Sequence, residues 1–466
     1  MRKKTKKKVN GIMVLLGCGM TLLMSGCGDI SVGVSQESST VVESQSESNA
    51  NREESGQETS KTQHLDSLLG EWIRIVSMGE DYYYVTDDLE YSATLDIYEE
   101  DEKYRIDYFD NEYGYVELSG MELHEVSKPK FEGNDSAEWY AEYERRRVDN
   151  ISYDIVKLSD DILKLHEHST YTYENEETGE TETYNDDYYY VYAKKDSPRI
   201  DDIFFQYCYR NTVTVSNIRE LYEAIADHTR IILKGGVYNI SELPLEDRNN
   251  PKLNMSYNYE TNEYVEYPYD SIKVEYVNWL LLEGEEGADV KICTEDGYEV
   301  PLYFEGGNHI TLKNLTIGHE VEPGTCSGAV VYLENSYNVE IKDCKLYGSG
   351  TYGIEADGAY NVNVDDSEIY ECTYGLVSFW NSNNIEFKNC NLRDSSGFNM
   401  FYLYNTWGAA FENCNISNNV VEQMGYPFVY HENGDVLFRN CQFAGNQYET
   451  LKKGDVVFEG CSISDN

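Results

Sequence analysis

The sequence has few basic residues for its size. Among 466 residues, 37 are Lys or Arg and 85 are Asp or Glu, which gives a formal net charge of −48. A protein that holds nucleic acid by its phosphates needs a basic face, so this balance excludes a nucleic-acid partner. Beyond the N-terminus no run is long and apolar enough for a bilayer, and we expect no membrane-spanning segment in the body of the chain.

Phenylalanine and tryptophan are scarce, whereas tyrosine is abundant. The chain has 14 Phe and 5 Trp against 43 Tyr. Because tyrosine is apolar along its ring and polar at its hydroxyl, this bias is typical of β-strands and of hydrated binding surfaces.

The N-terminus has the pattern of an export signal. Basic residues fill its start (Arg2, Lys3, Lys4, Lys6, Lys7 and Lys8), and an uncharged stretch with an apolar centre follows. That stretch ends in Met24-Ser25-Gly26-Cys27, which resembles the lipobox of bacterial lipoproteins, where a diacylated Cys becomes the new N-terminus. The resemblance implies a signal peptide over 1–26, lipidation of Cys27, and anchoring to the cell membrane on its extracytoplasmic side, at the bacterial cell surface. An uncleaved N-terminal membrane anchor is the alternative.

The next segment, 27–64, is rich in Ser, Glu, Gln and Asn. From Gly28 to His64 it contains no Phe, Trp or Tyr. Such a composition cannot bury enough surface to offset the entropy of ordering, so it predicts a disordered tether. Its root-mean-square reach would be roughly 35 Å.

Alternating apolar and polar runs mark the segment 65–197. Examples are Trp72 to Val76, Ala93 to Tyr98 and Tyr188 to Ala193. This period of two predicts a separate antiparallel β domain, which a linker over 198–211 follows. Leu69-Gly70-Glu71-Trp72 resembles the opening of lipocalin-like barrels, so a lipocalin-like barrel is one form that the domain could take.

Two histidines of this domain alternate on one strand. His166 and His168 lie two residues apart and therefore share a face. We interpret them as solvent-facing side chains and not as a metal site.

A repeated unit fills the second half of the chain. Its copies are Ile310 to Ile317, Val339 to Leu346, Val362 to Ile369, Ile385 to Leu392, Ala409 to Ile416, Val436 to Phe443 and Val456 to Ile463. They recur at steps of 29, 23, 23, 24, 27 and 20 residues without a helical pattern, which predicts one turn of a parallel β-solenoid per copy. The repeat resembles the right-handed parallel β-helix of the pectate-lyase superfamily over 212–466. The expected fold class is thus all-β, a right-handed parallel β-helix preceded by an antiparallel β domain.

Each copy has a polar residue before its bend (Asn314, Asp343, Asp366, Asn389, Asn413 and Asn440). A sharp corner needs a residue that tolerates left-handed backbone angles, and stacked amides can form an asparagine ladder. Ahead of the first coil, Asn217 and Glu220 have the spacing of a capping box and predict a short cap helix. A long insertion between Glu242 and Asn278 predicts a projecting loop.

Five cysteines share one inward column of the repeat (Cys344, Cys390, Cys414, Cys441 and Cys461). Neighbours in such a column stand about 4.8 Å apart with parallel side chains, a geometry unsuited to disulfides. The column therefore predicts buried free thiols. The pairing of Cys208, Cys293, Cys326 and Cys372 stays open.

A second strand in each coil carries the candidate site. Its inward column is Leu302, Val331, Ile354, Val377, Phe401 and Val429. Outward positions form two files: the first is Tyr303, Tyr332, Glu355, Ser378, Tyr402 and Tyr430, and the second is Glu305, Glu334, Asp357, Trp380, Tyr404 and Glu432. Neither file contains a Lys or Arg.

Stacked rings with interleaved carboxylates suit a sugar platform, because rings cover the apolar faces of pyranoses and carboxylates accept bonds from hydroxyls. The predicted ligand-binding residues are Tyr303, Tyr332, Trp380, Tyr402, Tyr404, Tyr430, Glu305 and Glu432. Glu334, Glu355 and Asp357 are the candidates for catalysis or for binding Ca²⁺, the one cofactor considered. A solvated acidic face is the alternative.

These features predict a surface lipoprotein whose β-helix binds extracellular polysaccharide. One alternative is a polysaccharide lyase or glycoside hydrolase that uses the three carboxylates, and another is an adhesion or structural spacer that binds protein. The resemblance implies that a lyase would pair Ca²⁺ with an Arg or Lys base, which the two files lack.

Overall fold

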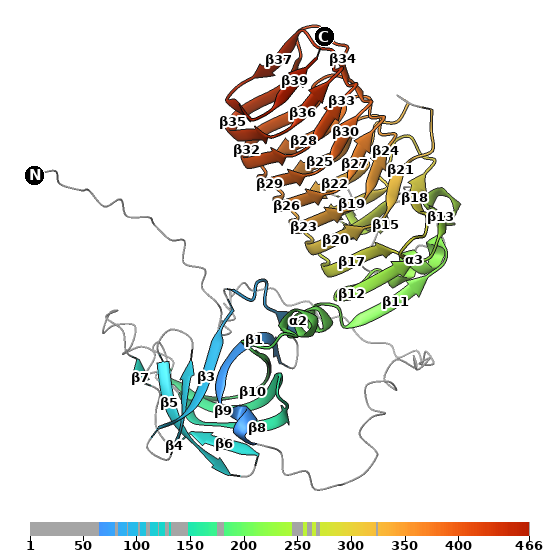
Figure 1. Ribbon diagram of the computed structural model, residues 1–466. Helices are drawn as coiled ribbons and strands as arrows, with labels where there is room; N and C mark the ends of the chain where they lie inside the picture. The colour runs from blue at the N-terminus through green and yellow to red at the C-terminus, as the bar shows by residue number, and fades with distance from the viewer. Residues whose placement is uncertain are drawn as a thin grey trace, which may run out of the picture. The chain divides into compact units, whose positions relative to one another are not determined.

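The computed structural model describes residues 65–465 apart from 80–82, 91, 101–102, 109–111, 120, 126–129, 132–147, 175–180, 245–254, 259–262, 267–270 and 323–324 (Figure 1). The predicted signal peptide, Cys27 and the predicted tether lie outside these residues. In the described part of the chain, no helix combines the length and the apolarity needed to cross a membrane. The fold is nearly all-β, as the sequence predicts.

The N-terminal domain is an antiparallel, barrel-like sheet. Its elements are η1 (Leu65–Leu68), β1 (Gly70–Met78), β2 (Tyr83–Val85), β3 (Thr94–Glu100), β4 (Lys103–Tyr108), β5 (Glu112–Ser119), β6 (Glu122–Glu125), β7 (Lys130–Phe131), β8 (Val148–Leu158), β9 (Ile162–Glu174) and β10 (Thr181–Lys194). Pairing runs from β1 through β3, β4, β5, β6, β8 and β9 to β10, which pairs with β1 again. The antiparallel domain expected from the alternating runs is therefore present.

Trp72 anchors the interior of this sheet. It is fully buried, and its indole N–H donates to the carbonyl of Leu68 in η1 at 2.9 Å. The ammonium of Lys194 lies 4.3 Å from the centroid of the Trp72 ring, a cation–π contact. The opening Gly-x-Trp thus fixes the start of β1 against the end of β10.

The predicted linker contains the helix α2 (Ile200–Cys208), and β11 (Asn211–Val215) begins at its end. The expected cap helix is α3 (Ile218–Ala224). The side chain of Asn217 accepts the backbone N–H of Glu220 at 3.0 Å, and the carboxylate of Glu220 accepts the N–H of Ser216 at 2.7 Å. The apolar side of α3 joins the core of the solenoid, as expected for a plug at its end.

The rest of the chain winds into coils of three strands, and the strands stack into parallel sheets (Figure 1). We call the sheet that carries the predicted files the site sheet: β16 (Ile272–Glu275), β19 (Leu302–Glu305), β22 (Val331–Glu334), β25 (Tyr352–Asp357), β28 (Gly375–Trp380), the first parts of β32 (Phe401–Glu412) and β35 (Pro427–Arg439), and β37 (Thr450–Lys453).

The second sheet contains β11, β12 (Thr229–Leu233), β17 (Asn278–Gly284), β20 (Asn308–Lys313), β23 (Tyr337–Lys342), β26 (Tyr360–Asp365), β29 (Asn383–Lys388), the later parts of β32 and β35, and β38 (Val456–Glu459). The third contains β13 (Gly236–Asn239), β18 (Val290–Thr294), β21 (Thr316–His319), β24 (Lys345–Tyr347), β27 (Glu368–Tyr370), β30 (Asn391–Arg393), β33 (Asn415–Ser417), β36 (Gln442–Ala444) and β39 (Ser462–Ser464). The remaining short elements are η3 (Ile240–Glu242), β31 (Ser396–Gly397) with β34 (Val420–Val421), and β14 (Met255–Asn258) with β15 (Glu263–Glu266), which form a separate antiparallel pair.

The copies of the repeat stack in the register that the sequence predicts. Ile310 pairs with Val339, and the column continues through Val362, Ile385, Ala409, Val436 and Val456. All seven residues are buried in one continuous apolar core. Within it, the ring of Phe411 stacks on Phe387 and Phe438 with centroids 4.8 and 4.7 Å apart.

The polar bend residues adopt the predicted left-handed backbone. Their φ angles are 54° (Asn314), 52° (Asp343), 48° (Asp366), 55° (Asn389), 55° (Asn413) and 54° (Asn440). The need for a residue that tolerates positive φ therefore explains the recurring Asn and Asp.

The asparagine ladder forms in a different column from the one predicted. Asn314 donates to backbone carbonyls of the preceding coil at 3.1 and 3.2 Å. The longest run of hydrogen bonds between asparagine side chains lies at the start of the second-sheet strands, where Asn338 donates to Asn308 at 2.9 Å, Asn361 to Asn338 at 2.7 Å, and Asn384 to Asn361 at 3.2 Å.

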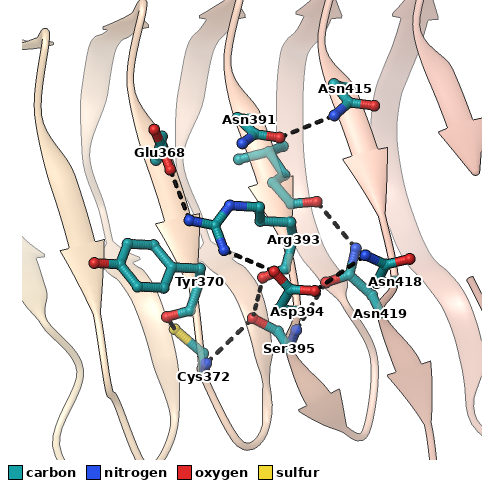
Figure 2. A network of polar contacts seen from close by, with 11 residues as sticks. Glu368, Tyr370, Cys372, Asn391, Arg393, Asp394, Ser395, Asn415, Asn418 and Asn419 are labelled. Atoms are coloured by element: carbon teal, nitrogen blue, oxygen red, sulfur yellow. Dashed lines mark hydrogen bonds and ion pairs between the residues drawn. The ribbon is translucent and has the colours of Figure 1, made fainter.

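Polar contacts also join successive coils on the third sheet (Figure 2). The guanidinium of Arg393 donates to Glu368 at 2.9 Å and to Asp394 at 2.6 Å. The same group lies 4.4 Å from the centroid of the Tyr370 ring. Arg393 is thus engaged by two carboxylates and a ring.

The predicted thiol column is confirmed. Cys344, Cys390, Cys414 and Cys441 are buried, Cys461 is partly buried, and all five are free. The four cysteines left open by the sequence, Cys208, Cys293, Cys326 and Cys372, are likewise buried and free.

We expect Cys390 and Cys414 to alkylate at least about 100-fold more slowly than Cys461 in native protein, because reagents reach them only through local opening. A hydrogen bond with Cys390, together with burial, also raises the pKa of Cys414 to about 12, so the reactive thiolate is rare. Mass-spectrometric labelling at timed intervals measures each rate, and full labelling after denaturation is the control. Equal rates at the three thiols would contradict the buried column.

Candidate functional site

The outer face of the site sheet carries both predicted files in the predicted register. In the first file, Tyr303 pairs with Tyr332, Tyr332 with Glu355, and Glu355 with Ser378, and the file continues to Tyr402 and Tyr430. The same pairings align Glu305, Glu334, Asp357, Trp380, Tyr404 and Glu432 in the second file. The predicted inward column, from Leu302 to Val429, is fully buried.

The structure adds to the site sheet one strand that the sequence prediction missed. We expected a loop between Glu242 and Asn278, yet β16 lies within this span and pairs with β19. Lys273 precedes Tyr303 in the first file, and Glu275 precedes Glu305 in the second. The expectation that the two files lack a cation is therefore wrong. Ile272 to Glu275 has the same alternation as Leu302 to Glu305, a signal present in the sequence.

Lys273 is held by carboxylates. Its ammonium lies 2.7 Å from Glu305 and 3.2 Å from Glu275, and 4.9 Å from the centroid of the Tyr303 ring. Burial alone would lower the pKa of Lys273, but the two carboxylates outweigh burial and raise it. The ammonium therefore keeps its proton, which makes it a poor general base.

A second lysine ends the first file on the other side. Lys453 of β37 pairs with Tyr430, and its ammonium lies 4.7 Å from the centroid of that ring. The first file thus begins and ends with a lysine over a tyrosine ring.

Aromatic side chains cluster near the middle and far end of the site sheet. The Trp380 ring lies 5.0 Å from the Tyr402 ring and 5.2 Å from the Tyr404 ring, centroid to centroid. Tyr402 stacks on Tyr430 with centroids 4.9 Å apart and planes within 4°. Trp380 is 38% exposed, so its face is available to a ligand. We call these four residues the aromatic platform.

Glu355 stands next to the platform and is partly buried. Its carboxylate has no hydrogen bond or ion pair with the other described residues, and burial raises its pKa. Ser378 is the next residue in the file and is buried, and its hydroxyl accepts the indole N–H of Trp380 at 3.1 Å. A small residue therefore separates Glu355 from the ring of Tyr402.

Tyr352 is a further aromatic residue beside Glu355 that the two-file prediction missed. It lies next to Gly375 on the following coil, where a Cβ atom would come within 2.8 Å of the Tyr352 ring and collide with the carbonyl of Asn399. Only glycine therefore leaves room for this ring. Burial, followed by the charge of Glu355, raises the pKa of the Tyr352 hydroxyl, which remains protonated and able to donate.

A third row of rings starts at Tyr352 and follows the bends before the site strands. Tyr352 meets Tyr374 at 6.4 Å, Tyr374 meets Phe398 at 4.8 Å, and Phe398 meets Tyr426 at 5.1 Å between centroids. Tyr374 and Tyr426 are exposed. These residues escaped the repeat comparison because the bends vary in length, so no fixed spacing marks them.

The carboxylates proposed for catalysis or Ca²⁺ are neighbours in the sheet. Glu334 and Asp357 pair on adjacent coils, as predicted. Glu334 accepts the hydroxyl of Tyr303, and Asp357 accepts the amide of Asn381 at 2.9 Å. Among the described residues, the one group whose ligand atoms all lie within 4.8 Å of one another is Asp154, His166 and His168, not these carboxylates. Ca²⁺ at Glu334, Glu355 and Asp357 stays a prediction.

The raised pKa of Glu355 predicts how the stability of the fold depends on pH. The unfolded chain loses this proton near its ordinary pKa of 4.5, and the folded chain loses it only at higher pH. Glu355 therefore lowers stability as pH rises through its folded pKa, and it has little effect in acid. We expect Glu355→Gln to raise the melting temperature at neutral pH and to leave it unchanged at about pH 4.

Thermal unfolding of both proteins across this pH range provides the measurement. Glu422→Gln removes the same charge from an exposed position and serves as the matched control. A gain for Glu355→Gln that is the same at both pH values would show that burial does not disfavour its ionised form.

The parallel sheets of the second half of the chain form a right-handed β-helix domain. Residues 300–466 match the family described as "Right handed beta helix region". No curated protein matches the chain.

Solved structures with similar backbones include ORF18 of Geobacillus virus E2, with a TM-score of 0.31, 10% identity, and coverage of 64% of this chain and 67% of that one. A pectate lyase overlaps with a TM-score of 0.29 and 11% identity over 55% of this chain and 82% of its own. The Streptococcus pneumoniae surface protein and adhesin PfbA overlaps with a TM-score of 0.26 and 9% identity over 53% of this chain and 90% of its own. Overlaps this weak carry no information about the activity of this chain.

Proposed function

We propose that the outer face of the site sheet binds extracellular polysaccharide. The observation that supports this most directly is the aromatic platform beside the carboxylate of Glu355, which has no partner among the described residues. Rings that stack along the axis of the solenoid present apolar faces to successive sugar rings, and carboxylates and tyrosine hydroxyls bond the sugar hydroxyls. A solvated acidic face needs no such continuity of rings.

The charge of the face favours neutral or amino-substituted glycans. Its two files carry carboxylates (Glu275, Glu305, Glu334, Glu355, Asp357 and Glu432) against two lysines, of which Lys273 is already paired. An anionic polysaccharide would meet repulsion from these groups and from the acidic chain as a whole. This balance also disfavours a lyase, since the buried lysine of the face is protonated.

Glycoside hydrolysis is the second candidate function. Glu355 supports it, because a carboxyl with a pKa raised by burial is suited to act as a general acid. Asp357 lies two residues after Glu355 and is exposed, and it would be the second carboxylate of the hydrolase.

A glycan array probed with the purified chain, with and without Ca²⁺, tests the binding proposal. Binding of the chain to neutral polysaccharides, equally strong with and without Ca²⁺, supports the proposal. Binding to none of the glycans would favour a spacer or an adhesin that binds protein. Incubation with the retained polysaccharides, followed by an assay for new reducing ends, separates hydrolysis from binding.

We further propose that a lipid on Cys27 anchors the protein to the outer side of the cell membrane, with 27–64 as the spacer. Cys27→Ala removes the acylated thiol and is expected to move more than about 90% of the protein from the membrane fraction to the soluble fraction, since an acyl chain contributes about 0.8 kcal/mol per buried CH₂. Detergent-phase partitioning measures the shift. Cys18→Ala is the matched control, and unchanged partitioning of Cys27→Ala would refute the anchor.

A further inference from the structure

A cluster of histidines and carboxylates lies on the barrel-like domain, apart from the proposed polysaccharide face. It spans three adjacent strands: Asp154 on β8, His166 and His168 on β9, and Asp187 on β10. Asp154 pairs directly with His166, and Asp187 pairs directly with His168. The register of the sheet, not sequence proximity, brings these groups together.

The ligand atoms of three of these residues converge. Nε2 of His168 lies 3.1 Å from Oδ2 of Asp154, and Nδ1 of His166 lies 4.0 Å from the same oxygen. Zn²⁺ bonds to nitrogen and oxygen are about 2.0 Å long, so tetrahedral ligands stand about 3.3 Å apart. The observed separations lie on either side of this value. An ion between the three atoms would therefore need only small movements of the side chains.

The fourth residue occupies the position of a supporting carboxylate. Nε2 of His166 contacts Oδ1 of Asp187, which leaves Nδ1 of His166 directed at Asp154. A histidine that binds zinc through one nitrogen commonly donates its other N–H to a carboxylate, which fixes the ring and strengthens the ligand. Stacking on Tyr189, with centroids 3.9 Å apart and planes within 9°, also holds the ring of His166.

Burial separates this histidine from an ordinary surface residue. The side chain of His166 is only 15% exposed, so the interpretation of both histidines as solvent-facing is wrong for His166. His168 and Asp154 are about half exposed, so an ion in solvent could reach these two side chains.

We propose that Asp154, His166 and His168 bind a divalent transition-metal ion, with Asp187 as the positioning residue. Two imidazoles and one carboxylate select Zn²⁺ over Ca²⁺ and Mg²⁺, which prefer all-oxygen ligands. Three protein ligands leave the fourth tetrahedral position to water or to a ligand from a partner.

Calorimetric titration of the full-length, metal-stripped chain with Zn²⁺ near neutral pH tests the site. We expect one equivalent to bind saturably. His166→Ala and His168→Ala should each weaken binding by at least about 100-fold, and Asp187→Asn by about 10- to 100-fold. His124→Ala is the matched control. His124 on β6 is exposed and lies 3.2 Å from the carboxylate of Glu122. We expect this variant to bind Zn²⁺ as tightly as the unaltered chain does.

A spectroscopic test on the unaltered chain keeps the proposal testable even if some variants fail to fold. Co²⁺ should produce the intense visible absorption of a tetrahedral site, and Zn²⁺ should displace it. Circular dichroism without metal establishes that each variant is folded. Absence of saturable binding, or binding that survives His166→Ala combined with His168→Ala, would show that these groups form only a hydrogen-bonded network.

Discussion

Trp380→Ala combined with Tyr402→Ala is expected to weaken polysaccharide binding by about 100-fold. The two rings lie 5.0 Å apart at the centre of the aromatic platform, where sugar rings would stack. A central aromatic residue typically contributes on the order of 1 to 2 kcal/mol to such a contact, and about 2.7 kcal/mol in total corresponds to this factor. Affinity electrophoresis in gels that contain the polysaccharide identified on the array measures the change.

Trp407→Ala is the matched control for that experiment. Trp407 lies on the same strand as Tyr402, is 54% exposed, and belongs to the second sheet. We expect this variant to bind with unchanged affinity. If the Trp380 and Tyr402 double variant retained full affinity while Trp407→Ala lost it, the ligand would occupy the second sheet and the proposed face would be wrong.

Phe411→Ala is expected to lower the free energy of unfolding by about 3 to 5 kcal/mol, the usual cost of removing a buried phenylalanine side chain. Phe411 is fully buried and stacks between Phe387 and Phe438. The neighbouring rings are fixed by the coils above and below, so the cavity cannot collapse without breaking sheet hydrogen bonds.

Urea unfolding followed by circular dichroism measures this loss. Trp407→Ala again serves as the control, because it removes an exposed aromatic residue four positions away, and we expect a change within about 0.5 kcal/mol. A similarly small change for Phe411→Ala would mean that the solenoid core is packed loosely at this coil.

The register of the repeat copies and the positions of both outward files were predicted correctly. A strand fixes the side of each residue by alternation, and parallel stacking repeats that assignment in every coil. The position of Leu302 and the spacing of the copies therefore determined both outward files through Glu432. Positive φ at Asn314 and its equivalents followed from the chemistry of asparagine in tight bends.

The parts that escaped prediction depend on contacts between residues distant in sequence. Lys273 entered the site only because β16 pairs with β19 across a long insertion. The carboxylate of Glu355 became distinct from that of Asp357 only through burial, and sequence alone gave both the same role. Bends of variable length placed Tyr374 beside Tyr352 and Tyr426 beside Phe398 without a recognisable spacing.

The sequence by itself determined the acidic character, the two kinds of β domain, the period of the solenoid and the side of the strand on which each file lies. These properties follow from composition and from short-range periodicity, which the backbone geometry of a strand converts directly into structure. Only the tertiary structure decided which groups meet across strands. The sequence places His166 and His168 on one face, but sheet pairing alone adds Asp154 and Asp187 to them, because register between strands is set by the packing of the whole domain.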